Sequence, residues 1–183
     1  NSDKYVYYTD VWTKMMSASS KANKPTELVT LTDMNLALGT NLKNFFGLEW
    51  IDTNTILVSE KGKYYTYSLT SKSGKITQVT PENAENQTFD LSKTNLAFTE
   101  ENNLYFLDKN NKKIAVTNET NKEIVSGQSI SRNEFGIKNG IFWSPKSSYL
   151  AFYQKDETEV ADYPLLDINE TPGKLISIKY PMI

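Results

Sequence analysis

The sequence contains neither cysteine nor histidine, and these two absences exclude much catalytic and metal chemistry. Without cysteine the chain has no disulfide, no thiolate nucleophile and no zinc–thiolate site. Without histidine it cannot supply a Ser-His-Asp triad, a Cys-His dyad or a histidine-ligated metal. We therefore expect no metal and no cofactor, and we expect this chain to be inactive as an enzyme by itself.

Long apolar runs and a strong charge of one sign are also missing. No apolar run approaches the ~18 residues that a membrane-spanning helix needs. The 20 basic and 22 acidic residues give a formal net charge of −2. These charges are scattered, so the chain lacks both the basic footprint of a nucleic-acid-binding protein and the charged run of a tail. The sequence predicts no nucleic-acid partner and no membrane span.

Aromatic residues are plentiful, and they occur in short runs typical of strands. The chain has 11 Tyr and 8 Phe residues, which favour strands over helices. Three strands are predicted at residues 56–58, 64–69 and 76–79, separated by turns rich in Gly, Ser and Lys. A fourth strand is predicted just upstream, from Phe45 to Trp50. Four such strands form a meander, which is the unit of a propeller blade.

The same pattern recurs twice further along the chain. Each unit has a leading aromatic residue, which is Trp50, Phe89 and Trp143 in turn. Each also has an aliphatic residue in the following strand, which is Ile56, Leu96 and Leu150. The spacing of 40 residues between the first two aliphatic positions fits a propeller repeat of about 40–50 residues. The next spacing is 54 residues, which indicates an insertion of about a dozen residues.

We therefore predict an all-β chain that forms a partial β-propeller of about four meander-type blades, with a short helical insertion near residues 128–138. A generic antiparallel sandwich is the alternative. The first unit is the least regular, and it includes a short helix from Thr32 to Leu38 with Thr32 or Asp33 as its N-cap. The predicted divisions of this single segment are a first blade at 1–40, blades at 45–80, 85–118 and 140–180, and an insertion at 119–138.

Residues 131–168 carry the most specific motif, SRNEFGIKNGIFWSPKSSYLAFYQKDETEVADYPLLDI. The string W-S-P-x-x-x-x-L-A alone is common among propellers, but RNEFG before it and DETEVADYP after it are specific. With these flanks the stretch resembles the N-terminal β-propeller region of the dipeptidyl peptidase IV family, which are prolyl oligopeptidase-type serine peptidases, in its bacterial form. Trp143, Ser144 and Pro145 are expected to end an inner strand and begin a turn. The acids at 156, 157 and 159 are interpreted as a charged turn, with a metal or acid–base site as the alternative.

The resemblance implies a role for the insertion. In this family a short helical insertion carries a pair of glutamates that hold the free amino group of the peptide substrate. Here the pair is replaced by Asn133-Glu134, so one carboxylate remains beside an amide that accepts a hydrogen bond. Arg132 is interpreted as a partner of Glu134 or of a substrate carbonyl. The alternative is that Glu134 is an ordinary exposed acid.

The resemblance also implies parts that this chain does not contain. The family's α/β-hydrolase domain carries the nucleophile in a G-x-S-x-G motif, which is absent here. We expect the chain to act on peptides only with such a domain, and to reach the periplasm or the outside of a bacterium after signal-peptide removal, since it begins at Asn1. Open sheet edges predict self-association as a homo-oligomer. The competing hypothesis is a stand-alone propeller that binds a protein or ligand without enzymatic activity.

Overall fold

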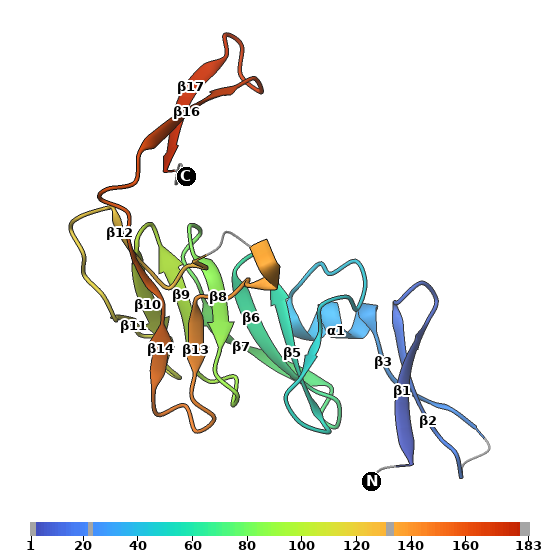
Figure 1. Ribbon diagram of the computed structural model, residues 1–183. Coiled ribbons are helices and arrows are strands. Elements are labelled where there is room, and N and C mark those ends of the chain that lie inside the picture. Colours follow the sequence, from blue (N-terminus) through green and yellow to red (C-terminus); the bar gives the residue numbers. More distant parts are fainter. Residues whose placement is uncertain (1–2, 22–23, 131–133, 180–183) are drawn as a thin grey trace.

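The computed structural model describes residues 3–21, 24–130 and 134–179. Its strands form antiparallel sheets that follow one another across the molecule in chain order (Figure 1). This arrangement confirms the prediction of an all-β chain with the meander sheets of a partial propeller. None of the helices in these ranges has the length and apolar character needed to cross a membrane.

The first sheet has three strands and leads directly into the only α-helix of the described residues. These elements are β1 (Lys4–Thr9), β2 (Lys14–Ser19), β3 (Thr26–Thr30) and α1 (Leu31–Leu38). The prediction of Thr32 or Asp33 as the helix cap was wrong, because Thr30 fills that position. The backbone of Thr30 is extended and its Oγ1 accepts the amide of Asp33 at 3.1 Å, which satisfies a donor that the first turn leaves free.

The second sheet is a four-stranded meander. Its strands, in spatial order, are β4 (Glu49–Trp50), β5 (Thr55–Glu60), β6 (Lys63–Ser68) and β7 (Ser73–Val79). The predicted strand from Phe45 to Trp50 is therefore too long. Phe45 is buried in the core and its amide donates to the carbonyl oxygen of Trp12 at 2.9 Å. This residue therefore packs against the first sheet and does not join the second one. Gly47 then turns the chain with a φ of +74°.

The third sheet repeats this meander, and the pairing between strands confirms the repeats seen in the sequence. Its strands are β8 (Glu85–Phe89), β9 (Leu96–Glu100), β10 (Asn103–Leu107) and β11 (Lys113–Ala115). In each repeat the leading aromatic residue faces the aligned aliphatic residue across the ladder. These pairs are Trp50 with Ile56, Phe89 with Leu96, and Trp143 with Leu150.

The remaining strands form three pairs. The pairs are β12 (Ile124–Ser126) with β15 (Gln154–Asp156), β13 (Ile141–Trp143) with β14 (Leu150–Phe152), and β16 (Asp162–Asp167) with β17 (Lys174–Lys179). Figure 1 shows the β16–β17 hairpin standing away from the other sheets. Since β14 and β15 are separated by one residue, they form one long strand edge that pairs first with β13 and then with β12.

A polar residue stabilises the turn that follows each leading aromatic. Asp52 accepts the amide of Thr55 through Oδ1 at 2.8 Å. In the last repeat, Ser144 Oγ accepts the amide of Tyr149 at 3.0 Å. The expectation that the W-S-P motif ends a strand and begins a turn is thus confirmed. Such short side-chain acceptors hold a turn without using strand hydrogen bonds.

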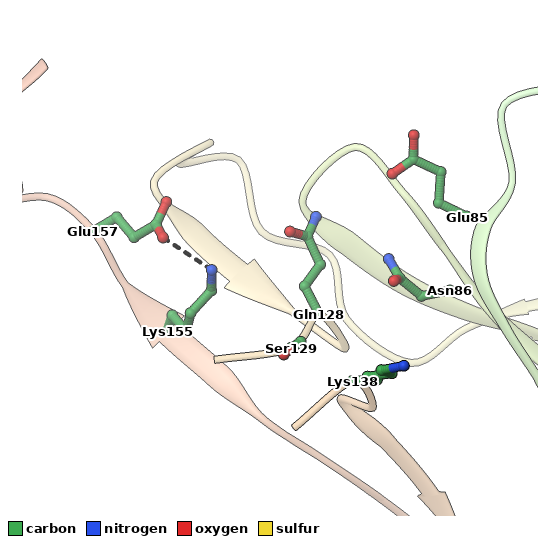
Figure 2. Close-up of a pocket in the computed structure, with 7 residues that line it drawn as sticks. All are labelled: Glu85, Asn86, Gln128, Ser129, Lys138, Lys155 and Glu157. Carbon is green, nitrogen blue, oxygen red and sulfur yellow. Dashed lines mark hydrogen bonds and ion pairs between the residues drawn. The ribbon is translucent and has the colours of Figure 1, made fainter. Parts of the chain in front are cut away.

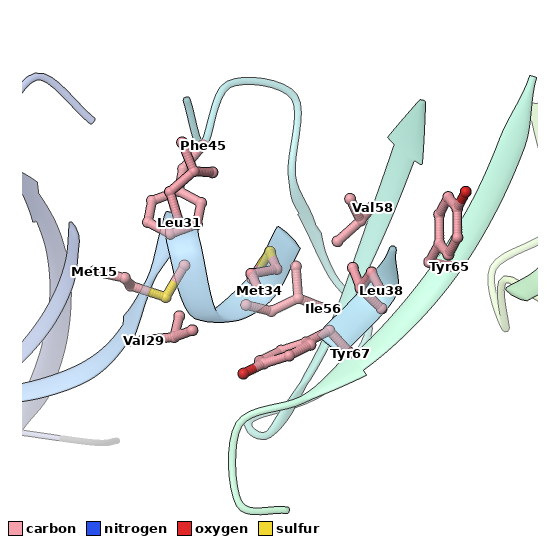
Figure 3. Packing of buried hydrophobic residues seen from close by; sticks show 10 residues of the cluster. All are labelled: Met15, Val29, Leu31, Met34, Leu38, Phe45, Ile56, Val58, Tyr65 and Tyr67. Atoms are coloured by element: carbon pink, nitrogen blue, oxygen red, sulfur yellow. The ribbon is translucent and has the colours of Figure 1, made fainter. Parts of the chain in front are cut away.

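Within the described ranges, three apolar clusters hold neighbouring sheets together. The largest lies between the first sheet, α1 and the inner strands of the second sheet (Figure 3). Its buried members are Met15, Val29, Leu31, Met34, Leu38, Phe45, Ile56, Val58, Tyr65 and Tyr67. The second cluster centres on Leu96 and Phe98, and the third on Leu104 and Ile141. Because each cluster joins consecutive sheets, the third one fixes β13 and the loop before it against the third sheet.

Candidate functional site

The two ends of the loop between β12 and β13 both form backbone hydrogen bonds with Tyr153, the residue between β14 and β15. The amide of Gly127 donates to the carbonyl oxygen of Tyr153 at 2.8 Å, and the amide of Tyr153 donates to the carbonyl oxygen of Gly140 at 2.9 Å. The two ends of the loop are therefore held side by side, and this closure at Gly127, Gly140 and Tyr153 is called the neck. This loop is the insertion predicted near residues 128–138, and its helical part among the described residues is one 3₁₀ turn, Glu134–Gly136.

Two glycines make this narrow neck possible. A Cβ on Gly140 would lie 2.2 Å from the carbonyl oxygen of Gln128, a separation that real side chains do not reach. Gly127 has a φ of +77°, and a Cβ there would lie 2.9 Å from Cγ2 of Thr99. The neck is closed further along the loop by Ser129, whose Oγ donates to the carbonyl oxygen of Ile137 at 2.7 Å.

The far end of the loop is a strained turn. Phe135 has φ 54° and ψ 18°, which is the left-handed region that bulky residues seldom adopt. Gly136 follows with a φ of +73°. Arg132 and Asn133 lie outside the described residues, and for Glu134 the structure describes the backbone but not the side chain. Such backbone strain persists only where the surroundings enforce it, and the hydrogen-bonded neck provides that restraint.

A polar cavity of about 310 Å³ lies at the neck (Figure 2). Its lining comes from β8, from both arms of the loop and from the end of β15 and the turn after it. The lining residues are Glu85, Asn86, Gln128, Ser129, Lys138, Lys155 and Glu157. The pairing register of β8 shifts between Glu85 and Thr88, and this irregularity turns the start of β8 toward the cavity.

The charges around the cavity are of both signs and are unevenly paired. Lys155 Nζ lies 2.9 Å from Glu157 Oε1, and both side chains are largely buried. Glu85 and Lys138 form no ion pair with any described residue. Asn86 Nδ2 donates to Thr99 Oγ1 at 2.8 Å, which fixes that amide at the cavity wall. The cavity therefore presents one satisfied ion pair and two separate charges to solvent.

The acids of the neighbouring turn serve local structure. Asp156 accepts hydrogen bonds from the amide and the hydroxyl of Thr158, and these bonds lower the pKa of the Asp156 carboxyl. The amide of Glu157 donates to the carbonyl oxygen of Glu123 at 2.8 Å, which ties the turn to the residue that precedes β12. Within the ranges that the structure describes, no three Asp or Glu residues gather in the manner of a metal site.

Sequence reasoning missed the neck and the cavity. Gly127 lies before the motif at residues 131–168, and Gly140 and Tyr153 lie inside it without an assigned role. Two glycines that flank a lengthened repeat are nevertheless a usable signal for a loop with close ends. The cavity could not be predicted from the sequence, because Glu85 and Lys155 are 70 residues apart in the chain and only strand pairing brings them near the loop.

Residues 52–183 match the family described as the dipeptidyl peptidase IV (DPP IV) N-terminal region. The chain belongs to this family. The chain is similar in sequence to dipeptidyl aminopeptidase B of Saccharomyces cerevisiae, with 32% identity over 95 aligned positions and coverage of 47% of this chain. Among solved structures it is similar to a candidate dipeptidyl aminopeptidase IV from Bacteroides ovatus, with 32% identity, a TM-score of 0.77 and coverage of 97% of this chain. Dipeptidyl peptidase 4 of Porphyromonas gingivalis shares the fold, with a TM-score of 0.63, 18% identity and coverage of 98% of this chain.

This DPP IV N-terminal region spans only a small part of each relative. It covers 12% of the yeast protein, 27% of the Bacteroides protein and 28% of the Porphyromonas protein. The chain thus corresponds to the N-terminal region of a peptidase family, and its sequence contains no histidine that could belong to a Ser-His-Asp triad.

Proposed function

We propose that this chain is the propeller portion of a DPP IV-like serine peptidase that shapes the substrate cavity and holds the free amino terminus of a peptide. The observation that carries the proposal is the closed neck, because it presents the turn Glu134–Gly136 on a loop whose two ends are fixed to Tyr153. A loop held in this way keeps a binding group in place before the ligand arrives, and this lowers the cost of binding.

Glu134 is the proposed ligand of the amino terminus. An ammonium group that enters a partly dehydrated cavity needs a carboxylate, and the charge-assisted hydrogen bond fixes its position. A peptide without a free amino group leaves that carboxylate unpaired and is rejected. Asn133 accepts a second hydrogen bond through its amide oxygen, and Arg132 either pairs with Glu134 or contacts a peptide carbonyl.

The proposal includes the wider organisation of the protein. The blades are 1–40, 45–80, 85–118 and 140–180, and the sheets β4–β7 and β8–β11 support the two central ones. The catalytic groups are supplied by an α/β-hydrolase domain outside this chain. We place the protein in the periplasm or outside a bacterial cell, which agrees with the bacterial origin of both solved neighbours. Open sheet edges pair with a second copy.

The test is a peptidase assay on the longest polypeptide that contains this chain, with a chromogenic Gly-Pro substrate. Glu134→Gln is expected to lower kcat/KM at least about ten-fold, because an ion pair becomes a neutral hydrogen bond. Glu170→Gln, which removes an exposed acid in the β16–β17 hairpin, is the matched control and should leave kcat/KM within about two-fold. Equal effects of the two substitutions, or no hydrolysis by the unaltered polypeptide, would refute the proposal.

The second candidate is a stand-alone propeller that binds a ligand or protein without catalysis. The polar cavity favours it, because Glu85 and Lys138 offer separate charges of opposite sign. Isothermal titration of the 183-residue chain with Gly-Pro and with N-acetyl-Gly-Pro separates the two. Binding that ignores the amino group and weakens on Lys138→Gln supports this candidate, whereas binding only of the free amine, lost on Glu134→Gln, supports the first.

A further inference from the structure

The turn between β9 and β10 holds the chain segment that leads into the neck. Asn102 lies in this turn and is only 7% exposed. Its Nδ2 donates to the carbonyl oxygens of Asn121 and Ile124, each at 3.0 Å, so both hydrogens of the amide are used. The carbonyl oxygen of Asn102 also accepts the amide of Ser126 at 2.9 Å. One residue therefore fixes the segment before β12 and β12 itself, up to the residue that precedes Gly127.

The two neighbours of Asn102 bond to the same segment. Glu101 has a left-handed backbone with a φ of +50°, and its carbonyl oxygen accepts Gln128 Nε2 at 3.1 Å. Asn103 Oδ1 accepts the amide of Glu119 at 2.7 Å, and Asn103 Nδ2 donates to the carbonyl oxygen of that residue at 3.0 Å. The turn thus holds the chain both before the neck and just inside the loop.

The equivalent turn of the second sheet shows that a blade does not need this side chain. Between β5 and β6 the position of Asn102 is filled by Gly62, whose carbonyl oxygen accepts the amide of Thr80 at 2.9 Å. There the connection to the next sheet is short, at residues 80–84, whereas the connection after β11 covers 116–140 and carries the insertion. The asparagine side chain therefore serves the long connection and not the turn.

We infer that Asn102 is a positioning residue for amino-terminus binding: its side chain fixes the first arm of the loop, and the loop in turn holds Glu134 in place. This inference rests on the proposed role of Glu134. A binding group that is fixed before the ligand arrives loses less freedom on binding, so a loosened arm weakens the affinity. The amino terminus is held both in the bound substrate and in the transition state, so the loss is expected in KM and not in kcat.

The test measures KM and kcat for a Gly-Pro substrate in variants of the longest polypeptide that contains this chain. Asn102→Gly deletes the side chain and introduces the residue that the equivalent turn already uses; it should raise KM about five-fold and keep kcat within about two-fold. Asn102→Asp preserves the shape but places a carboxylate against the carbonyl oxygens of Asn121 and Ile124, and it should raise KM at least as much. In the Glu134→Gln background, Asn102→Gly should change KM by less than about two-fold, because the two residues act through one contact.

A control at the other end of a blade separates positioning from general destabilisation. Asn54 Nδ2 donates to Ser68 Oγ at 3.0 Å, and Asn54 Oδ1 accepts the amide of Thr70 at 2.8 Å, at the end of the second sheet away from the β5–β6 turn. Asn54→Gly removes a similar set of hydrogen bonds, so it should lower stability to urea as Asn102→Gly does while keeping KM within about two-fold.

The outcomes distinguish this inference from the proposed function. The inference is wrong if Asn102→Gly leaves KM unchanged, if Asn54→Gly raises KM equally, or if the effect of Asn102→Gly is as large in the Glu134→Gln background. In each of these cases a lower kcat/KM in Glu134→Gln alone still supports amino-terminus binding. If Glu134→Gln alone has no effect, the proposed function fails and the inference fails with it.

Discussion

The indole Nε1 of Trp143 donates a hydrogen bond to the carbonyl oxygen of Thr88 at 3.0 Å. This bond joins β13, which follows the neck, to the edge strand β8 of the third sheet, whose irregular start lines the cavity. The ring of Trp143 also packs edge-on against Phe106, with centroids 5.9 Å apart. One side chain thus couples the loop that carries Glu134 to the sheet beside it.

Replacing Trp143 with Phe should therefore destabilise the chain through the lost donor. Most of the ring packing survives, so the expected loss is about 1 kcal/mol in the free energy of unfolding. Urea unfolding followed by far-UV circular dichroism measures it. Trp50→Phe is the matched control, because Trp50 has the equivalent place in the second sheet and its indole bonds to no described residue; it should cost less than about 0.5 kcal/mol. Equal losses would contradict the role of the Thr88 bond.

Asp90 makes the free energy of unfolding of the chain depend on pH in the acid range. The carboxylate of Asp90 is buried, and burial by itself raises the pKa of this group. Hydrogen bonds from the side chain of Asn95 and from the amide of Thr94 outweigh that effect and lower the pKa below 3.8. Because the folded pKa is depressed, the contribution is present above pH 3.8 and is lost as the pH falls through the folded pKa. The free energy of unfolding should therefore decrease on acidification below about pH 5.

Asp90→Asn should remove this part of the acid dependence. Urea unfolding at a series of pH values between neutral and strongly acid is the measurement, and the variant is expected to show a shallower slope below about pH 5 and lower stability at neutral pH. Glu82→Gln, at an exposed residue without a hydrogen bond to a described residue, controls for the loss of one negative charge. An unchanged slope in Asp90→Asn would show that other carboxylates dominate.

The repeats were predictable from the sequence because they depend on local alternation. The aligned aromatic and aliphatic residues, such as Phe89 and Leu96, face each other in the structure because strand pairing preserves the period of two. The helix boundary was less predictable, since Thr30, Thr32 and Asp33 are all good caps and only the extended backbone of Thr30 decides among them. Local pattern also failed at Phe45, where burial against the first sheet overrides strand formation.

The candidate site was predictable only in part. The lengthened repeat located the insertion, but its closure depends on Tyr153, which lies beyond the W-S-P turn and meets the loop only after β12 and β15 pair. The strained backbone of Phe135 has no signature in sequence at all, since bulky residues are normally excluded from that conformation. Nonlocal pairing and strain are therefore the features that the structure adds.

Tyr67 carries a buried hydroxyl without a hydrogen-bond partner among the described residues. Tyr67→Phe removes this unpaired group, so the free energy of unfolding is expected to stay the same or to rise by up to about 1 kcal/mol. Tyr64→Phe on the same strand is the opposing control, because the Tyr64 hydroxyl donates to Gln87 Oε1 and its loss should cost about 0.5–1.5 kcal/mol. Thermal or urea unfolding of both variants is the measurement. The prediction is wrong if Tyr67→Phe lowers the free energy of unfolding more than Tyr64→Phe does.

The neck itself is tested by adding one methyl group at Gly140. In Gly140→Ala the new Cβ meets the carbonyl oxygen of Gln128, so the two arms of the loop must move apart, at an expected cost of about 1–3 kcal/mol. Opening the neck should also raise the rate at which a protease cleaves between residues 128 and 139. Gly136→Ala is the control within the same loop, because its Cβ points into open space and only the left-handed backbone is penalised, by about 1 kcal/mol. If Gly136→Ala accelerates cleavage as much as Gly140→Ala, the loop is held by its turn rather than by its neck, and the restraint assigned to Tyr153 is wrong.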